Sequence, residues 1–185
     1  MSLLAKILWT IALLTIGVGL GVDDLTGLEL AYAPPFGSAK DPVNVVGYVA
    51  GNVLSGFQEI IDWRALRDLL KTAPSSVQLV DVRTPTEFSA GTIPGALNIE
   101  VDGLRERLGE IDPGRPVVVF CQVGLRGYLA YRILKQSGFT DVRNLTGGFK
   151  TYSLATGKQS APNLSAESAE LRTEEDREGE PAGHI

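Results

Sequence analysis

The strongest constraint on the fold is an uninterrupted apolar run, Pro116-Val117-Val118-Val119-Phe120, which leads directly to the single cysteine, Cys121. A continuous apolar run without polar alternation is typical of a strand buried on both faces in the middle of a parallel sheet. Parallel strands require long crossover connections, and helical patterns do flank this run. The sequence therefore predicts an α/β domain in which Cys121 lies at the carboxyl end of a central strand.

Short apolar runs alternate with helical patterns over residues 57–156, and this alternation predicts a mostly parallel five-stranded sheet flanked by helices. The predicted strands are Glu59–Ile61, Val77–Val82, Ala96–Ile99, Pro116–Phe120 and Asp141–Leu145. Helices are predicted after Asp62 (with Leu66, Leu69 and Leu70 on one face), over Pro85–Ala90 and Val101–Leu108, after Cys121 (with Leu129, Ala130, Ile133 and Leu134 buried), and from Gly147-Gly148 through Tyr152. Trp63 and Phe88 are predicted to be core aromatics.

Residues 1–22 form an apolar segment, because no charged residue occurs from Ile7 to Val22. A helix that spans a bilayer needs roughly 20 apolar residues, so residues 3–22 are a borderline membrane segment. A signal peptide cleaved after Ala31-Tyr32-Ala33 and a buried or partner-facing helix are the alternatives. We expect a cytoplasmic protein, or a membrane-anchored one whose α/β domain faces the cytoplasm.

Residues 23–56 and 157–185 differ from the α/β domain in composition. In the first segment, Asp41-Pro42 predicts the start of a helix that continues to about Leu54. In the second, acidic residues outnumber basic ones and account for most of the net charge of −5. Its low apolar content predicts a disordered tail, with a regulatory or partner-binding tail as the alternative. The net negative charge also argues against binding to nucleic acid.

The chain has one cysteine and one histidine, His184. An internal disulfide is therefore impossible, and a zinc site built from cysteine and histidine has too few ligands. Serine-histidine catalysis is excluded as well, because His184 is the penultimate residue of the polar tail. We expect no metal site.

Cys121 begins a short loop that leads into a helix, and Arg126 follows with four residues between them. Ligands of open α/β sheets bind at this carboxyl edge. We expect the backbone N–H groups of Gln122, Val123, Gly124 and Leu125, the helix N-terminus and Arg126 to favour a thiolate, the nucleophilic form of cysteine. The same donors would hold a persulfide.

The length of this loop separates two chemistries that use a cysteine and an arginine. The loop of a cysteine phosphatase is one residue longer, so that it can surround a tetrahedral phosphate. The shorter loop here favours a single sulfur atom carried by Cys121. Phosphate or arsenate chemistry is the disfavoured alternative, and an inert core cysteine is another.

Four segments together resemble the successive motifs of rhodanese domains. They are Leu79-Val80-Asp81-Val82-Arg83, Glu87-Phe88, Gly91-Thr92-Ile93-Pro94-Gly95-Ala96 with Asn98, and Cys121-Gln122-Val123-Gly124-Leu125-Arg126. The resemblance covers about residues 57–156 and implies a thiosulfate sulfurtransferase-like enzyme. In such an enzyme Cys121 accepts a sulfane sulfur, becomes a persulfide, and passes the sulfur to a thiophilic acceptor. The sequence departs from the family pattern at Thr92, where rhodanese domains more often have histidine.

The resemblance implies that Cys121 is the nucleophile, that Arg126 is the basic residue of the loop, and that the N–H groups of residues 122–126 cradle the persulfide. Arg83 is a candidate substrate contact, with a surface ion pair to Glu87 as the alternative. Asp81 is expected to hold backbone N–H groups of its own loop.

Residues 29–44, Glu29-Leu30-Ala31-Tyr32-Ala33-Pro34-Pro35-Phe36-Gly37-Ser38-Ala39-Lys40-Asp41-Pro42-Val43-Asn44, are similar to the end of the dimerisation domain in flavin-dependent coenzyme A-disulfide reductases and NADH oxidases. Some members of that family carry a rhodanese domain after this segment, and Tyr32 matches a tyrosine that reaches the partner subunit's active site. The FAD and nicotinamide domains are absent from these 185 residues, so we expect no cofactor.

Two functions follow from these patterns. The first is a sulfurtransferase that uses a small sulfur donor, such as thiosulfate, and an external thiol or protein acceptor, since the chain has no second cysteine. The second is a non-catalytic sulfur carrier or interaction module, held against a reductase subunit or a membrane by its N-terminal segment and equivalent to the C-terminal fragment of a coenzyme A-disulfide reductase.

Overall fold

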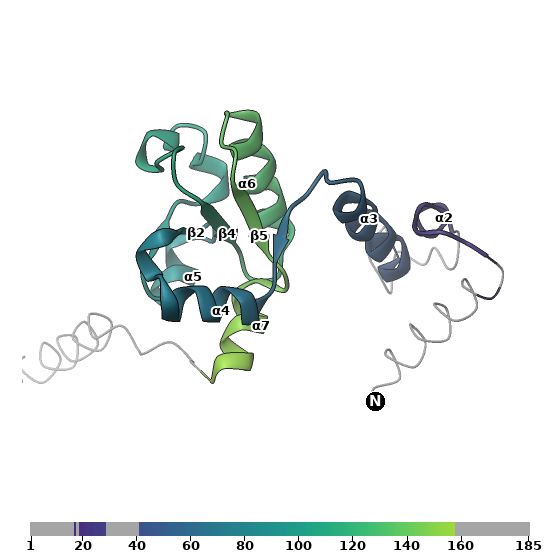
Figure 1. Cartoon of the computed structure of the whole chain (residues 1–185), viewed down its shortest axis with the longest axis horizontal. Helices are drawn as coiled ribbons and strands as arrows, with labels where there is room; N and C mark the ends of the chain where they lie inside the picture. The colour runs from purple at the N-terminus through teal and green to yellow at the C-terminus, as the bar shows by residue number, and fades with distance from the viewer. Residues whose placement is uncertain (1–16, 18, 29–40, 158–185) are drawn as a thin grey trace, which may run out of the picture. The chain divides into compact units, whose positions relative to one another are not determined.

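The computed structural model describes residues 17, 19–28 and 41–157 (Figure 1). The chain divides into two compact units, Met1–Gln58 and Glu59–Ile185. Most of the apolar segment 1–22, the segment around Tyr32 and the acidic tail lie outside the described residues. Within the described ranges, no helix combines the length and the apolar character needed to cross a membrane.

In the first unit, helix α2 (Val22–Thr26) packs against helix α3 (Pro42–Leu54). The predicted start of α3 is confirmed, with Asp41 as N-cap and Pro42 in its first turn. The Asn44 side chain joins the two segments, because its Nδ2 donates to the carbonyl oxygens of Leu25 and Leu28 at 2.9 Å.

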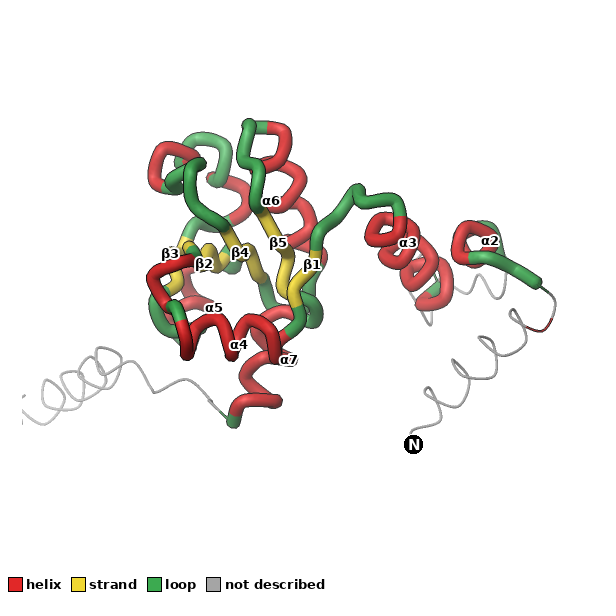
Figure 2. Tube along the Cα trace, in the orientation of Figure 1, coloured by secondary structure: helices red, strands yellow, loops and turns green. Residues whose placement is uncertain are grey.

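The second unit contains the five-stranded sheet, and the predicted α/β class is confirmed (Figure 2). The strand order is β1-β5-β4-β2-β3, and every neighbouring pair is parallel. The strands are β1 (Ile60–Ile61), β2 (Gln78–Asp81), β3 (Ala96–Asn98), β4 (Val117–Phe120) and β5 (Val142–Leu145). The apolar run before Cys121 is the central strand β4, and all four of its residues are buried.

Helices cover both faces of this sheet (Figure 1). They are α4 (Trp63–Thr72), α5 (Pro85–Ser89), α6 (Leu125–Gln136) and α7 (Gly148–Thr156). Val117 and Val119 of β4 pack in one cluster with Ala130 of α6. Val118 and Phe120 point to the other face and pack in a cluster with Tyr152 of α7. The alternation of side chains along β4 therefore divides the core into two layers.

Three details differ from the sequence predictions. Residues 101–108 do not form one helix but contain a short 3-10 turn, Val101–Gly103, and a second turn follows at Leu108–Glu110. Gly103 and Gly109 disfavour a continuous helix there. Leu129 is exposed because it lies on the outward face of α6, whereas the next residue, Ala130, faces the sheet. Trp63 and Phe88 are half-buried, and Trp63 packs against the core cluster that contains Tyr152.

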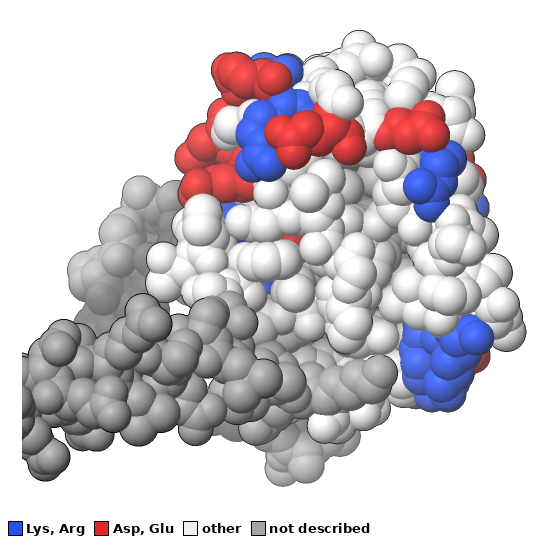
Figure 3. All heavy atoms as spheres, turned by 90° about the vertical axis from the view of Figure 1, so that its left-hand side faces the viewer, with Lys and Arg blue, Asp and Glu red and all other residues white. Residues whose placement is uncertain are grey.

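Charged side chains on the face shown in Figure 3 are of both signs, and they flank a largely uncharged middle. Acidic side chains gather at the upper left of this view and a separate group of basic ones lies at the lower right.

Candidate active site

Cys121 follows β4 directly and is only 1% exposed. The Gly124 N–H donates a hydrogen bond to its Sγ over 3.1 Å. Gly124 has a φ of 152°, a conformation that L residues with a side chain rarely adopt, and this conformation turns its N–H toward the sulfur. This bond confirms one of the N–H contacts that the sequence predicts for the loop.

Helix α6 begins at Leu125, immediately after this loop, and its N-terminal end lies beside the sulfur. The Tyr128 N–H donates to the Gly124 carbonyl at 2.8 Å and so closes the first turn of the helix on the loop. The free N–H groups of a helix N-terminus carry a partial positive charge, which stabilises an anionic sulfur.

The N-terminus of α7 supports the same loop from a second side. The N–H of Phe149 donates to the Cys121 carbonyl at 2.8 Å, and the N–H of Lys150 donates to the Gln122 carbonyl at 3.1 Å. Gly148 has a positive φ of 59°, and a Cβ at this position would overlap the Cys121 carbonyl oxygen. Glycine is therefore required for this close approach.

Asn144 of β5 supports the loop from a third side. Its side chain is 4% exposed, and its Nδ2 donates to the Gly124 carbonyl at 3.3 Å. A Cβ at Gly127 would overlap the Asn144 amide, so a glycine in α6 leaves room for it. Gly124 is thus held on both sides: its carbonyl oxygen accepts from Asn144, and its N–H donates to the sulfur.

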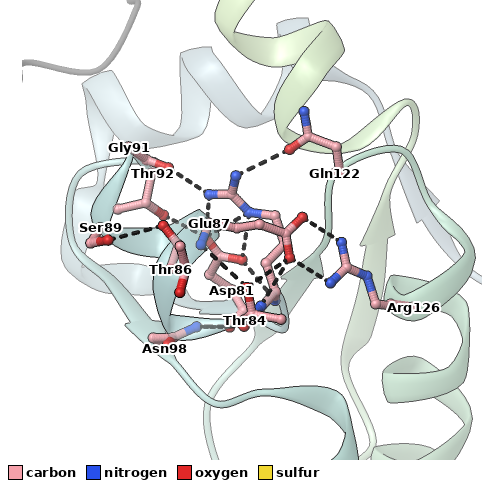
Figure 4. Close-up of polar contacts among 11 residues, drawn as sticks. Asp81, Thr84, Thr86, Glu87, Ser89, Gly91, Thr92, Asn98, Gln122 and Arg126 are labelled. Carbon is pink, nitrogen blue, oxygen red and sulfur yellow. Dashed lines mark hydrogen bonds and ion pairs between the residues drawn. The ribbon is translucent and has the colours of Figure 1, made fainter.

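Arg126 forms a bidentate ion pair with Glu87 of α5, with both Nη–Oε distances at 2.7 Å (Figure 4). Hydrogen bonding from Arg126, with further bonds from Thr84, lowers the pKa of Glu87 to about 2. The pKa of Arg126 is raised, chiefly by its hydrogen bonds to Glu87 and to a smaller extent by Cys121. We expected Arg126 to contribute a full positive charge, but in the structure Glu87 compensates that charge.

Arg83 is 3% exposed and occupies the space between β2 and the loop. Its Nη2 pairs with Asp81 at 2.7 Å and donates to the Gly91 carbonyl at 2.6 Å. Its Nη1 donates to Gln122 Oε1 at 3.1 Å, and its guanidinium lies 4.3 Å from the centre of the Phe149 ring. The alternative of a surface ion pair between Arg83 and Glu87 is therefore wrong.

Asp81 is fully buried at the end of β2 and organises this region (Figure 4). It accepts the backbone N–H of Arg83 at 3.0 Å, which confirms the predicted role. It also accepts a hydrogen bond from the hydroxyl of Thr92 at 2.7 Å. Thr92, at which the sequence departs from the rhodanese pattern, therefore helps to hold Asp81.

A hollow of about 440 Å³ lies next to the cysteine loop. It is lined by Arg83, Glu87, Ala90, Gly91, Gln122 and Phe149. A slightly larger hollow of about 490 Å³, lined by residues such as Arg67, Pro94 and Tyr152, includes none of the loop residues. We assign the first as the approach to Cys121, because Gln122 and Glu87 connect it to the loop and to Arg126.

The structure brings together all of the sequence-predicted site residues, although they contribute differently. Val123 and Leu125 are 57% and 70% exposed, so their side chains face outward from the loop. Sequence reasoning did not assign roles to Phe149 and Asn144, since neither belongs to a motif that predicts a contact with the loop. In the part of the chain that the structure describes, no group of acidic, histidine or cysteine side chains is suited to hold a metal ion.

A sequence profile of the Rhodanese-like domain family matches residues 62–155, which is half of the chain. The chain belongs to this family. The thiosulfate sulfurtransferase GlpE of Shewanella oneidensis is 40% identical over 81 residues, covering 44% of this chain and 80% of that protein. The human thiosulfate:glutathione sulfurtransferase is 37% identical over 102 residues, covering 47% of this chain and 86% of that protein.

Two solved structures extend the similarity beyond the rhodanese domain. Reduced Bacillus anthracis CoADR-RHD superposes with a TM-score of 0.75 at 40% identity, over 82% of this chain and 27% of that one. The NAD-dependent persulfide reductase of A. fulgidus gives a TM-score of 0.66 at 35% identity, over 77% and 25%. The chain thus spans about a quarter of each. A match over 82% of the chain reaches into the first unit, in agreement with the resemblance of residues 29–44 to coenzyme A-disulfide reductases.

Proposed function

We propose that this rhodanese domain is a sulfurtransferase that carries the transferred sulfur as a persulfide on Cys121. The observation that carries the proposal is the hydrogen bond from the Gly124 N–H to Cys121 Sγ, in a loop that opens into the N-terminus of α6. This arrangement places fixed donors around the position where an anionic sulfur forms, so no reorganisation is needed during transfer. The sulfurtransferase names of two relatives support the proposal.

The chemistry requires two displacements at sulfur. The Cys121 thiolate attacks the terminal sulfur of a donor, a new sulfur–sulfur bond forms, and the donor's own bond to that sulfur breaks. The leaving group takes the bonding electron pair, as sulfite if the donor is thiosulfate or as a thiolate if it is a persulfide. An acceptor thiolate then attacks the outer sulfur and restores the Cys121 thiolate.

The second displacement uses a thiol from outside the chain, because Cys121 is its only cysteine. We propose that the acceptor is a small thiol or a thiol on a partner protein. The residues that position the loop are proposed to act through Cys121: Arg126 beside the sulfur, residues 122–125 through their N–H groups, and Arg83 near the approach. Neither flavin nor nicotinamide is needed for this transfer.

The direct test is mass spectrometry of the intact protein after incubation with a sulfane sulfur donor. Wild-type protein is expected to gain the mass of one sulfur atom on Cys121 and to lose it on addition of cyanide or a thiol. The Cys121→Ser variant keeps the fold, as judged by circular dichroism, but gains no sulfur. Wild-type protein that gains no sulfur from any donor would overturn the proposal.

A sulfur-carrier role beside a reductase is the second candidate, and the match over 82% of the chain to CoADR-RHD favours it. The two functions differ in turnover. A free-standing sulfurtransferase converts thiosulfate and cyanide to thiocyanate over many cycles. A carrier is loaded once and is discharged only when a flavin-dependent reductase subunit is added.

A further inference from the structure

We infer that Glu87 selects sulfur donors by their charge, so that Cys121 accepts sulfur from donors with at most one negative charge in preference to a dianion such as thiosulfate. This inference rests on the proposed function, because it concerns which donor loads Cys121.

Arg126 is the cation nearest in sequence to the sulfur, and its charge is already used within the protein. Both of its terminal nitrogens are engaged by the two oxygens of Glu87, each at 2.7 Å. A bidentate pair of this geometry is strong and directional. Since the pKa of Glu87 is about 2, its carboxylate stays ionised throughout the neutral range. The pair therefore presents no net positive charge to a donor.

Arg83, the second arginine of the site, is compensated in the same way. It is 3% exposed and pairs with Asp81, which is fully buried. Its Nε also donates to Asp81, its Nη1 donates to Gln122, and its Nη2 donates to the Gly91 carbonyl. Its guanidinium face is covered by Phe149. A dianionic donor in the hollow would find this cation buried and already paired.

The surface of the hollow itself carries the opposite sign. Among its six lining residues, the acidic one is Glu87, whose side chain is 33% exposed, whereas the basic one is the buried Arg83. The remaining four lining residues are uncharged. Arg126 is 32% exposed but does not line the hollow, so a donor that enters this approach meets the carboxylate end of the ion pair. Each added negative charge on the donor increases the repulsion from that end.

The expected effect of one donor charge on the rate of loading follows from Coulomb's law. At a separation of about 8 Å and an effective dielectric constant of about 40, one additional donor charge changes the rate of loading about fivefold. Removing the carboxylate charge should therefore favour thiosulfate over a singly charged donor by about that factor.

The test uses Glu87→Gln, which keeps the shape of the side chain and one acceptor oxygen for Arg126 but removes the charge. Rates of persulfide formation on Cys121 are measured in single turnover with thiosulfate, a dianion, and with an aryl thiosulfonate, a monoanion that transfers the same kind of sulfur. The ratio of the two rate constants is expected to rise about fivefold in favour of thiosulfate. Glu110→Gln is the matched control, because Glu110 forms a bidentate pair with Arg107 but does not line the hollow.

An unchanged ratio in Glu87→Gln, or an equal change in Glu110→Gln, would overturn the inference while leaving the proposed function intact. Absence of loading by either donor in wild-type protein would overturn both. If Glu87→Gln does not fold, the ionic strength dependence of the wild type decides. Salt screens repulsion, so loading by thiosulfate must accelerate with added salt more than loading by the thiosulfonate; slowing of thiosulfate loading would refute the selection.

Discussion

Substitution of Gly148 by alanine tests whether the N-terminus of α7 holds the cysteine loop in its reactive shape. A Cβ at this position would overlap the carbonyl oxygen of Cys121 and lie 2.8 Å from the carbonyl carbon of Gln122. These are backbone atoms, so they cannot move aside by changing a rotamer. We therefore expect the new methyl group to push the loop away from α7 and to break the bond from Phe149 N–H to Cys121 O.

The expected loss of stability in Gly148→Ala has two parts. Alanine at a φ of 59° costs about 1 to 2 kcal/mol of backbone strain. The overlap with the loop adds about 1 to 3 kcal/mol, as for other small-to-large changes in packed regions. Gly157, at the other end of α7, has a similar φ of 66° but open space around the missing Cβ. Gly157→Ala therefore isolates the backbone strain.

Urea unfolding gives the loss of stability, and the rate of persulfide formation on Cys121 gives the effect on the loop. Gly148→Ala is expected to lose about 1 to 3 kcal/mol more stability than Gly157→Ala, and to load sulfur at least about tenfold more slowly. Equal stability losses together with equal loading rates would refute the claim that α7 positions the loop.

Two further predictions concern the ion pairs. Asp81→Asn leaves the buried guanidinium of Arg83 without its counter-charge and should cost about 3 kcal/mol or more in urea unfolding, whereas Glu110→Gln at the exposed pair should leave the unfolding curve unchanged; similar losses would contradict the assigned roles. The folded-state pKa of Glu87, about 2, lies below its ordinary value of 4.5, so its stabilisation is complete above about pH 4.5 and is lost as the pH falls toward 2. Solvent screening at a side chain that is one-third exposed reduces this to roughly 1 kcal/mol, and acid titrations of stability should show that drop in wild type and not in Glu87→Gln.

Most of the fold could be predicted because the spacing of apolar residues along the chain shows which side chains are buried, and this spacing can be read from short segments of sequence. The run Val117–Phe120 predicts a strand buried on both faces, and it is the central strand of the sheet. The prediction fails at residues 101–108, where apolar residues at helical spacing pack against the core from short 3-10 turns. Periodicity reports which side chains are buried and not the hydrogen bonding of the backbone between them.

The position of Cys121 could also be predicted, since a cysteine at the end of a buried strand and before a helix has few alternative placements. The balance of charges around Cys121 could not be predicted from the sequence. Arg126 and Glu87 lie 39 positions apart, and no local pattern shows that their side chains meet. The same holds for Asn144, whose contact with Gly124 depends on the order of β4 and β5 in the sheet.

The pairing of both arginines leads to a mechanistic consequence. A sulfur anion near Cys121 is stabilised mainly by oriented N–H groups, namely the Gly124 N–H and the N-terminus of α6, rather than by an uncompensated side-chain charge. Such dipoles act only over short distances and depend on orientation, in contrast to a net charge. The reactivity of Cys121 toward an uncharged reagent should therefore be more sensitive to small shifts of the loop backbone than to ionic strength. The loop accordingly has three separate supports, from α7, from Asn144 and from Arg83 through Gln122, and each of them contacts the backbone or side chain of a loop residue.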